Sequence, residues 1–586
     1  MTERKSMKEQ LEARFRTELD QLRAEERSKA GAGRPSASGR PRKRQVNQRA
    51  LDARIRRPET TAPEPPPQVV RPRRQAPAAP PPPPRPQAVP PTHWVPPHEE
   101  IQLVDAFQPT GGDWVIAPVT GRRTATPTTS VFRAFSKRPI VQVGLDFGTS
   151  STKVMWYRTD VADHMPRTAD FGHGLQGYPA YALPSLASFD ARGTLLIGDG
   201  AVSSLPPDRL PFALSRFKML VAGDADATYR DAHTRTLFAE HVRRALGDEE
   251  RCTPEMLTVV FLAFAMRRVR RHIEQVLARS DIEANFNTCV PVDQRENNAV
   301  YTAFQRIVGA AQRLEAKAKD DESARAWLER AGEALALGEV PPEERRLHLV
   351  PEAVAGTAAY VGSLRRESGI HALVDIGSGT TDVSIFNLTL SQERGATSSW
   401  YAARSAPKGM GLVELRLRHE LRQRGHAGDA DEVREILRGR FTKLPEAATV
   451  LREMLETIRV KEANEVWATA YRDKYRIESA WRGKRVRVFL AGGGALIPLA
   501  REVFARSWVS DWGPYPCEII PDPENYVEAK VGAPFVRVSV AYGLTTPIPQ
   551  LEEFIMPKDA PNDTPPPAPR REWVQDGDQL LPRAGW

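Results

Sequence analysis

A glycine-bearing turn occurs twice in this chain, each time directly after an apolar strand that ends in an aspartate. The first copy is VGLDFGTSSTKVMWY (143–157) and the second is ALVDIGSGTTDVSIFNL (372–388). In both copies Ser and Thr fill the turn, and a second apolar run follows at the spacing of a tight hairpin. The repeat predicts two matched β-hairpins, which would form a clamp for an anion if they faced each other.

The residue types in these turns suit a nucleotide bound with a magnesium ion. Glycine lets the backbone approach an anion closely, so N–H groups in and beside the turns can point at phosphate oxygens. A carboxylate beside a polyphosphate needs a cation between them, so Asp146 and Asp375 indicate Mg²⁺ held through water. An ordinary β-hairpin is the alternative for either turn taken alone. The polar residues beside the glycines are Thr149, Ser150, Thr380 and Thr381.

A third glycine element follows near the end of the chain. The segment VRVFLAGGGALIP (486–498) predicts a buried strand that ends in Gly492, Gly493 and Gly494. Backbone without side chains could lie flat against a nucleoside there. Three such elements in this order favour a nucleotide site over two unrelated hairpins.

The three elements resemble those of the actin, hexokinase and heat-shock chaperone ATPase superfamily. The resemblance is strongest to the nucleotide-binding domain of the heat-shock protein 70 (DnaK) family, whereas sugar kinases share the glycine turns but not the segments between them. It implies an α/β fold of the two-lobed, actin-like (ribonuclease-H-like) ATPase type. The further segments that carry it are LPSLASFDARGTLLIGDGA (183–201), FNTCVPVDQRENN (286–298), LHLVPEAVAGTAAYV (347–361) and FVRVSVAYGLT (535–545).

The resemblance also implies roles for individual residues. Asp146 and Asp375 would hold the magnesium and its waters, Thr149 and Thr380 would contact the phosphates, and Glu352 would orient the attacking water. Without the resemblance, Glu352 reads as an acid favoured at a helix N-terminus by the helix dipole. The implied nucleotide contacts are Gly148, Thr149, Ser150, Gly377, Ser378, Gly379, Thr380, Thr381, Gly492, Gly493 and Gly494, with Asp382 supporting the second hairpin.

The sequence departs from the family pattern at several positions. The phosphate-contacting lysine of the family falls on Ser215 in the simplest register, with Arg216 and Lys218 as substitutes, and Lys218 is taken as the catalytic candidate. Two further departures are Leu496, where many relatives have an arginine that stacks on adenine, and Arg537, where they have an acidic residue before the last helix. Glu456 and Arg459, with Lys461, are the matches to the helix that lines the adenine.

Composition divides the chain into four parts. The expected parts are an amphipathic helix at 1–30, a disordered basic and Pro-rich linker at 31–131, the ATPase domain at 132–548 and a flexible tail at 549–586. The first 100 residues hold 21 Lys+Arg and 12 Asp+Glu, so the whole net charge of +9 lies there. Residues 61–100 contain 16 prolines, a composition that cannot bury enough apolar surface to fold. On the resemblance, we expect this tail to be too short for the peptide-binding domain of typical relatives.

The N-terminal extension predicts interactions rather than chemistry. A lone helix of this length is marginal in water, so we expect it to dock on a protein partner or on another copy of the chain. The Pro-rich stretch could bind an aromatic groove but is more typical of a spacer. Residues 40–57 predict at most weak, salt-sensitive contact with nucleic acid or an anionic surface.

We therefore expect a cytoplasmic molecular switch that binds ATP/ADP with Mg²⁺, hydrolyses ATP and is related to chaperones. A filament-forming cytoskeletal or segregation protein and a nucleotide-sensing pseudo-ATPase scaffold are the alternatives. The three scattered cysteines make no disulfide framework or zinc motif, which fits a reducing compartment. The longest apolar run, at 256–266, is too short to span a bilayer and predicts a buried helix.

Overall fold

The computed structural model describes residues 138–561 with short gaps, and the predicted N-terminal helix and the linker up to residue 131 lie outside the described residues. The gaps are 162–164, 173–174, 176–177, 190–193, 205–213, 318–322, 392–394, 440–446, 510–511, 525, 527–531, 549–550 and 552.

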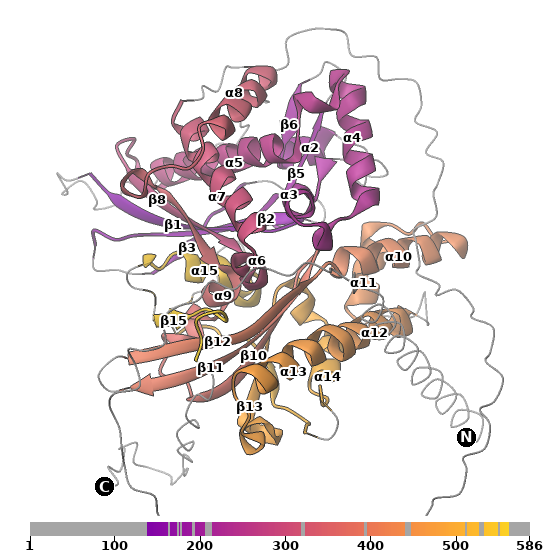
Figure 1. Cartoon of the computed structure of the whole chain (residues 1–586). Coiled ribbons are helices and arrows are strands. Elements are labelled where there is room, and N and C mark those ends of the chain that lie inside the picture. Colours follow the sequence, from indigo (N-terminus) through magenta and orange to yellow (C-terminus); the bar gives the residue numbers. More distant parts are fainter. Residues whose placement is uncertain are drawn as a thin grey trace, which may run out of the picture. The chain divides into compact units, whose positions relative to one another are not determined.

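The first large sheet is built around the first glycine turn. Its strand order is β3-β2-β1-β8-β9, with β4 also pairing β2 (Figure 1). Strand β1 is antiparallel to β2 and parallel to β8, which is in turn parallel to β9. Nearly every residue of β1 is buried, which explains its continuous apolar sequence. The strands are β1 (Ile140–Phe147), β2 (Ser151–Arg158), β3 (Arg167–Thr168), β4 (Ala182–Pro184), β8 (Glu283–Val290) and β9 (Leu347–Pro351).

The second large sheet is built around the second glycine turn, with the order β14-β13-β10-β11-β12-β15. Strand β10 is antiparallel to β11 and parallel to β13, and β13 is parallel to β14. The strands are β10 (Gly369–Ile376), β11 (Thr381–Ser391), β12 (Gly395–Ala406), β13 (Val486–Ala491), β14 (Cys517–Ile519) and β15 (Glu553–Ile555). A third, small sheet has the order β6-β5-β7, from β5 (Leu186–Phe189), β6 (Leu195–Ile197) and β7 (Leu214–Ser215).

The two large sheets share one plan. In each, an antiparallel hairpin is followed on its first strand by two parallel neighbours, β8 and β9 in the first sheet and β13 and β14 in the second. Both predicted hairpins and the predicted strand before Gly492 are confirmed. The sequence repeat thus corresponds to a repeat of strand order and direction in a mixed α/β fold.

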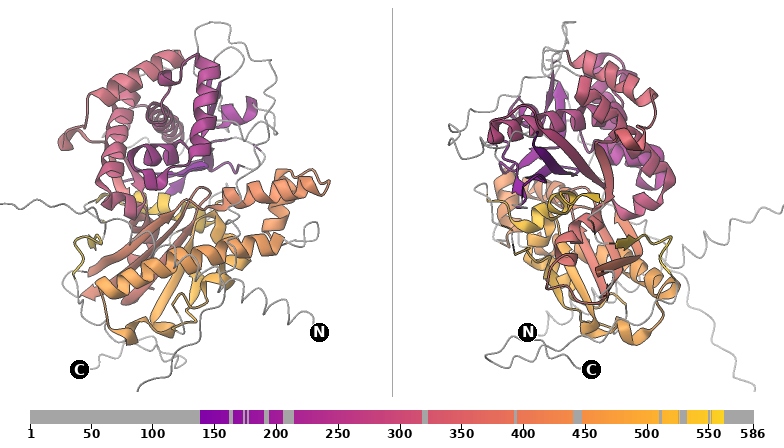
Figure 2. Two further views of the ribbon diagram at one scale, coloured as in Figure 1. Left: turned by 45° about the vertical axis from the view of Figure 1, so that its right-hand side comes forward. Right: turned by 90° about the vertical axis from the view of Figure 1, so that its left-hand side faces the viewer.

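Helices pack on both sheets (Figures 1 and 2). The apolar run at 256–266 lies within α5 and is buried almost throughout, as predicted. Residues 310–342 hold the end of α7 and all of α8, and residues 425–455 contain α11 and most of α12. The helices are α2 (Asp199–Ser204), α3 (Phe217–Ala225), α4 (Ala232–Leu246), α5 (Pro254–Leu277), α6 (Val292–Glu296), α7 (Asn298–Lys317), α8 (Ala324–Ala336), α9 (Glu352–Val361), α10 (Met410–Gln423), α11 (Ala430–Leu437), α12 (Ala447–Thr457), α13 (Asn464–Asp473), α14 (Pro498–Phe504) and α15 (Phe535–Leu544).

Two helices join the sheets at close range. Helix α15 contacts β1 and β2 of the first sheet, β13 of the second sheet, and α9. A Cβ on Gly543 of α15 would lie 1.9 Å from the carbonyl oxygen of Ala355 in α9, and a Cβ on Gly144 of β1 would lie 2.1 Å from that of Ala541. Only glycine fits at such separations, so these contacts fix α15 against α9 and the first sheet.

The C-terminal boundary differs from the expected one. Strand β15 pairs in parallel with β12, and the Thr397 hydroxyl donates to a Glu553 carboxylate oxygen over 2.9 Å. The Lys474 ammonium donates to the Ala560 carbonyl over 2.8 Å. The domain therefore extends beyond residue 548, and the expected flexible tail from 549 is corrected for residues 553–560. Three strand residues between prolines carry little periodic signal, so local sequence does not predict this strand.

Candidate active site

The first hairpin places an acid opposite a lysine. Asp146, near the end of β1, pairs in register with Lys153 of β2, and the Lys153 ammonium lies 3.1 Å from Asp146 Oδ2. The Gly148 N–H donates to the Asp146 carbonyl over 3.0 Å and closes the turn. A Cβ on Gly148 would lie 2.5 Å from the Ser151 carbonyl oxygen, which explains the glycine.

The second hairpin places an acid opposite another acid. Asp375, near the end of β10, pairs in register with Asp382 of β11. The Thr380 hydroxyl donates to Asp382 Oδ2 over 3.0 Å. The Gly377 and Ser378 carbonyls accept the first two N–H groups of α10, over 2.9 and 2.8 Å, so the start of that helix holds the turn.

The two turns, more than 220 residues apart in sequence, meet at their tips. A Cβ on Gly379 would lie 2.5 Å from Cγ2 and 2.7 Å from Oγ1 of Thr149. The approach leaves no space for any side chain at position 379. The structure therefore brings the two sequence-predicted turns together.

The third glycine element lies against the second hairpin. Gly492 has a φ of 77°, and a Cβ there would lie 2.2 Å from Asp375 Oδ1. A Cβ on Gly494 would lie 2.3 Å from Ile376 Cγ2. The glycines after β13 thus allow the backbone to pass directly beside the aspartate, and all three predicted elements converge.

Glu352 and Lys218 form an ion pair beside the first hairpin. Glu352 begins α9 directly after β9, and Lys218 lies in α3. The Lys218 ammonium donates to the Phe147 carbonyl over 2.8 Å and lies 3.4 Å from Glu352 Oε2. Ser215, the residue of the simplest register, instead pairs with Leu186 in the small sheet.

Arg216, the other substitute for the lysine, lies at the edge of the second turn. Its backbone has a left-handed φ of 56°, and its guanidinium lies 3.8 Å from Asp231 Oδ2. The Arg216 Nη2 atom would be 3.5 Å from a Cβ on Gly411, in the first turn of α10. Lys218 therefore lies next to the acids, whereas Arg216 contacts the helix that supports the second hairpin.

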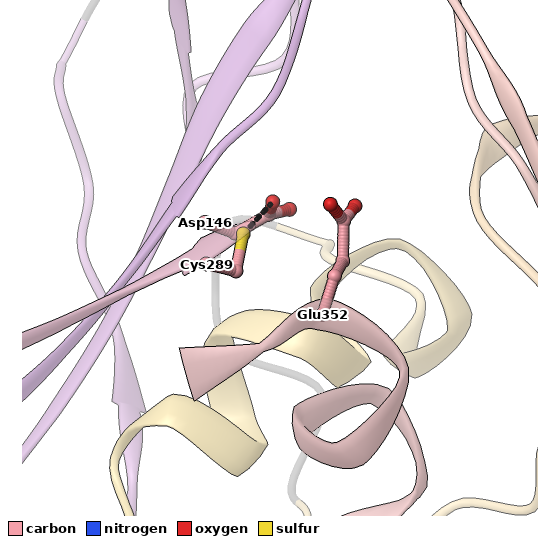
Figure 3. A group of neighbouring side chains, drawn as sticks. All are labelled: Asp146, Cys289 and Glu352. Atoms are coloured by element: carbon pink, nitrogen blue, oxygen red, sulfur yellow. Dashed lines mark hydrogen bonds between the residues drawn. The ribbon is translucent and has the colours of Figure 1, made fainter. Parts of the chain in front are cut away.

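Three potential metal ligands lie at the carboxyl ends of three adjacent parallel strands. Asp146 lies near the end of β1, Cys289 lies near the end of β8 and Glu352 follows β9, and their donor atoms lie within 4.8 Å of one another (Figure 3). The Cys289 thiol lies 3.7 Å from Asp146 Oδ1. The carboxyl edge of parallel strands is the usual ligand-binding edge of α/β sheets. In this chain the edge carries two carboxylates, of Asp146 and Glu352, and the thiol of Cys289.

The charges of the site perturb one another. Burial alone would lower the pKa of Lys218, but neighbouring acids, Glu352 foremost, outweigh burial and raise it. Burial raises the pKa of Asp375 to about 7, and Glu352 and Asp146 contribute in the same direction. Burial also raises the pKa of Asp382, with Glu352 again contributing. The site therefore holds more carboxyl groups than its lysines neutralise.

Glu456 and Arg459, the residues predicted to line the adenine, form ion pairs and hydrogen bonds with each other and with the loop after α14 rather than with the glycine turns. The Arg459 guanidinium pairs with Glu456 Oε2 at 2.7 Å and donates to the Ser507 carbonyl, while Glu456 Oε1 pairs with Arg506 at 2.6 Å. Arg459 lies in a π-helical turn, Ile458–Ala463, a distortion common at functional sites. These contacts fasten the loop after α14.

Sequence reasoning missed two site residues, Lys153 and Cys289. Lys153 could have been found from hairpin register, because the residue seven positions after each aspartate faces it across the turn. Cys289 could have been found from the parallel pairing of Leu145 with Thr288, which makes it the neighbour of Asp146. Neither signal can be read before the strand pairing is known.

Comparison with protein-family models and with curated proteins finds no match for this chain. None of the helices in the described part of the chain combines the length and the apolar character needed to cross a bilayer. All three cysteines are free and buried.

Proposed function

We propose that this chain is a magnesium-dependent, ATP-binding switch that hydrolyses ATP, similar to the nucleotide-binding domain of the heat-shock protein 70 family. The observation that carries the proposal is the meeting of two glycine turns from distant parts of the sequence, each at the end of a strand that bears a carboxylate. The shared plan of the two large sheets supports the finer assignment to the actin-like, ribonuclease-H-like fold.

The turns supply the groups that a polyphosphate requires. Thr149, Ser150 and Thr380 offer backbone N–H groups and hydroxyls beside residues without side chains. The buried Thr381 hydroxyl instead donates to the Lys408 carbonyl over 2.8 Å. Two ammonium groups lie beside acids of the site, that of Lys153 next to Asp146 and that of Lys218 next to Glu352. We propose that these lysines complete the charge neutralisation of the phosphates in place of the family lysine that falls on Ser215.

The carboxylates of Asp146 and Asp375 fit a magnesium ion. Both offer hard oxygen donors, which Mg²⁺ prefers. Burial foremost raises the pKa of Asp375, and Glu352 and Asp146 raise it further, a repulsion that a bound cation would relieve. Bound magnesium would neutralise phosphate charge. We propose that both residues hold its waters, so replacement of Asp375 should remove magnesium-dependent binding.

Glu352 is the proposed water-orienting residue. It lies at the start of α9, and its Oε2 atom is held by Lys218, which is itself anchored on the Phe147 carbonyl. This fixes the carboxylate beside the first turn, leaving Oε1 to accept a proton or a hydrogen bond from water. Catalysis in such a site consists of positioning and charge stabilisation.

The same proposal includes a route by which the bound nucleotide changes the surface of the protein. Closure of the turns around nucleotide would change surfaces fixed by α9 and α15, which join both sheets. We propose that an unidentified protein partner reads this change, with residues 1–30 as one docking segment. We propose that Glu456 and Arg459 hold the loop after α14, and that the backbone of this loop lines the pocket for the adenine base.

The test is ATP hydrolysis and nucleotide binding by the full chain, with and without magnesium. We expect turnover in the parent protein, a loss of about 100-fold or more in Glu352→Gln with binding retained, and loss of magnesium-dependent binding in Asp375→Ala. Lys317→Met, an exposed lysine of α7, serves as a control that leaves both unchanged. Binding without turnover would favour a nucleotide-sensing scaffold, and absence of binding would refute the proposal.

A further inference from the structure

The thiol of Cys289 is out of place in a site for magnesium. Mg²⁺ takes oxygen ligands, and thiolates are ligands of softer ions such as Zn²⁺ and Cd²⁺. Cys289 is 1% exposed and lies beside Asp146 at the carboxyl edge of the parallel strands, where Glu352 directly follows β9 (Figure 3). The donor set is therefore one sulfur and two carboxylates, from three separate elements.

The spacing of these donors fits a tetrahedral zinc ion. Zn–S bonds of about 2.3 Å and Zn–O bonds of about 2.1 Å, at the tetrahedral angle, separate sulfur from oxygen by about 3.6 Å. The Cys289 Sγ atom lies 3.7 Å from Asp146 Oδ1. The Glu352 donor lies within 4.8 Å of the other two, and a small rotation of its long side chain would bring it to bonding distance.

The two lysines leave the required oxygens available. Lys153 contacts Asp146 through Oδ2, whereas Oδ1 faces the thiol. Lys218 contacts Glu352 through Oε2, so Oε1 can face the thiol and Asp146. Each carboxylate is thus oriented by a cation on one oxygen, in the way that outer-shell partners orient metal ligands.

We propose that Asp146, Cys289 and Glu352 bind a thiophilic divalent ion of the Zn²⁺ class, and that this ion competes with the magnesium nucleotide for the same carboxylates. As the sulfur–metal bond forms, the S–H bond breaks and its proton leaves to solvent; nothing is oxidised or reduced. The fourth coordination position remains open to water. The proposed ion binding does not depend on the proposed function, whereas the proposed competition rests on it.

The first test uses cadmium alone, on the full chain without nucleotide, and follows the ultraviolet sulfur-to-cadmium charge-transfer absorption. We expect a saturable band at one ion per chain, reversed by added zinc and lost in Cys289→Ser. Cys252→Ser and Cys517→Ser, at buried cysteines outside the cluster, are matched controls that retain the band. Absence of a saturable band, or a band that survives in Cys289→Ser, would overturn the proposal.

A second variant keeps the test decisive if Cys289→Ser does not fold. Glu352→Gln retains the sulfur but weakens one carboxylate ligand. We expect the band to persist with its half-saturation raised about tenfold or more, because even outer-shell changes shift metal affinity about 10–100-fold. An unchanged half-saturation would mean that cadmium binds the thiol alone, and would refute the three-residue site.

Competition is measured separately, as the ratio of nucleotide affinity with and without zinc at constant magnesium. We expect zinc to weaken nucleotide binding in the parent protein and to have no effect on the ratio in Cys289→Ser. If the parent binds no nucleotide, the proposed function fails while the cadmium band still decides the metal site. If nucleotide binds and zinc leaves its affinity unchanged, the competition is refuted.

Discussion

The two hairpins have the same geometry and opposite electrostatics. In each, an aspartate near the end of the first strand faces the residue seven positions later, so that Asp146 pairs with Lys153 and Asp375 with Asp382. The first hairpin carries its own counter-charge, and the second places two carboxyl groups across from each other. A repeat of backbone structure has therefore not been accompanied by a repeat of charge.

The difference separates two tasks within one site. Asp146 is held by Lys153 and the Cys289 thiol, so its position does not depend on a bound ion. In the second hairpin the residue opposite Asp375 is the carboxyl of Asp382 rather than a lysine. Burial raises the pKa of both groups, and Glu352 contributes to both. A cation that enters the site should gain most from the second hairpin.

The largest expected effect follows from removing the lysine of the first hairpin, because this removes the charge difference between the two hairpins. Lys153→Met leaves Asp146 as a largely buried carboxylate without its cation, so we expect the free energy of unfolding to fall by about 3 kcal/mol, measured by urea denaturation. The double variant Asp146→Asn/Lys153→Met should recover most of the loss, because no unpaired charge remains.

Lys317→Met is the matched control, an exposed lysine whose replacement should change stability by less than about 0.5 kcal/mol. Equal effects of Lys153→Met and Lys317→Met would show that the first hairpin is not held by its ion pair, and would remove the contrast between the hairpins.

The second prediction concerns pH and isolates the other hairpin. The pKa of Asp375 is about 7 in the folded chain, against the value of 3.8 for an ordinary aspartate, which applies to the unfolded chain. Between these two pH values the folded chain therefore binds one proton more than the unfolded chain. Stability should therefore fall as pH rises from about 4 to 7, by up to about 1.4 kcal/mol per pH unit for one proton, and level off above 7.

Asp375→Asn should flatten this fall, since the amide does not titrate. Asp281→Asn, at an exposed aspartate paired with Arg279, should leave it in place. Parallel stability curves for the parent protein and Asp375→Asn, recorded by urea unfolding across this pH range, would contradict the assignment of the missing charge to the second hairpin.

The sequence predicts the features of this site that depend on local patterns, and misses those that depend on tertiary contacts. The two glycine turns, the strand before Gly492 and the buried helix α5 come from local patterns, and the structure confirms them. The contact of Gly379 with Thr149 and the neighbourhood of Asp146 and Cys289 depend on tertiary packing and strand pairing. Local patterns carry no information on such pairings.

The base side and the C-terminus show the same limit. Glu456 and Arg459 were placed by analogy, and their hydrogen bonds join them to each other and to the loop after α14. Strand β15 is only three residues long, and it is recognisable as a strand only through its pairing with β12. Both features depend on distant partners rather than on their own sequence.

The smallest effect tests whether the two hairpins act as one site. Gly379→Ala would place a Cβ 2.5 Å from Thr149 Cγ2, so we expect overpacking to cost on the order of 1 kcal/mol in urea unfolding. Thr149→Ala removes the two nearest atoms, Cγ2 and Oγ1, and leaves Cβ at 2.9 Å, so it should rescue part of that loss in the double variant. Gly200→Ala, in α2 with open space around it, should be neutral or stabilising by up to about 1 kcal/mol. Additive losses in the double variant would mean that the tips are independent, and the charge difference between the hairpins would then belong to two separate turns rather than to one clamp.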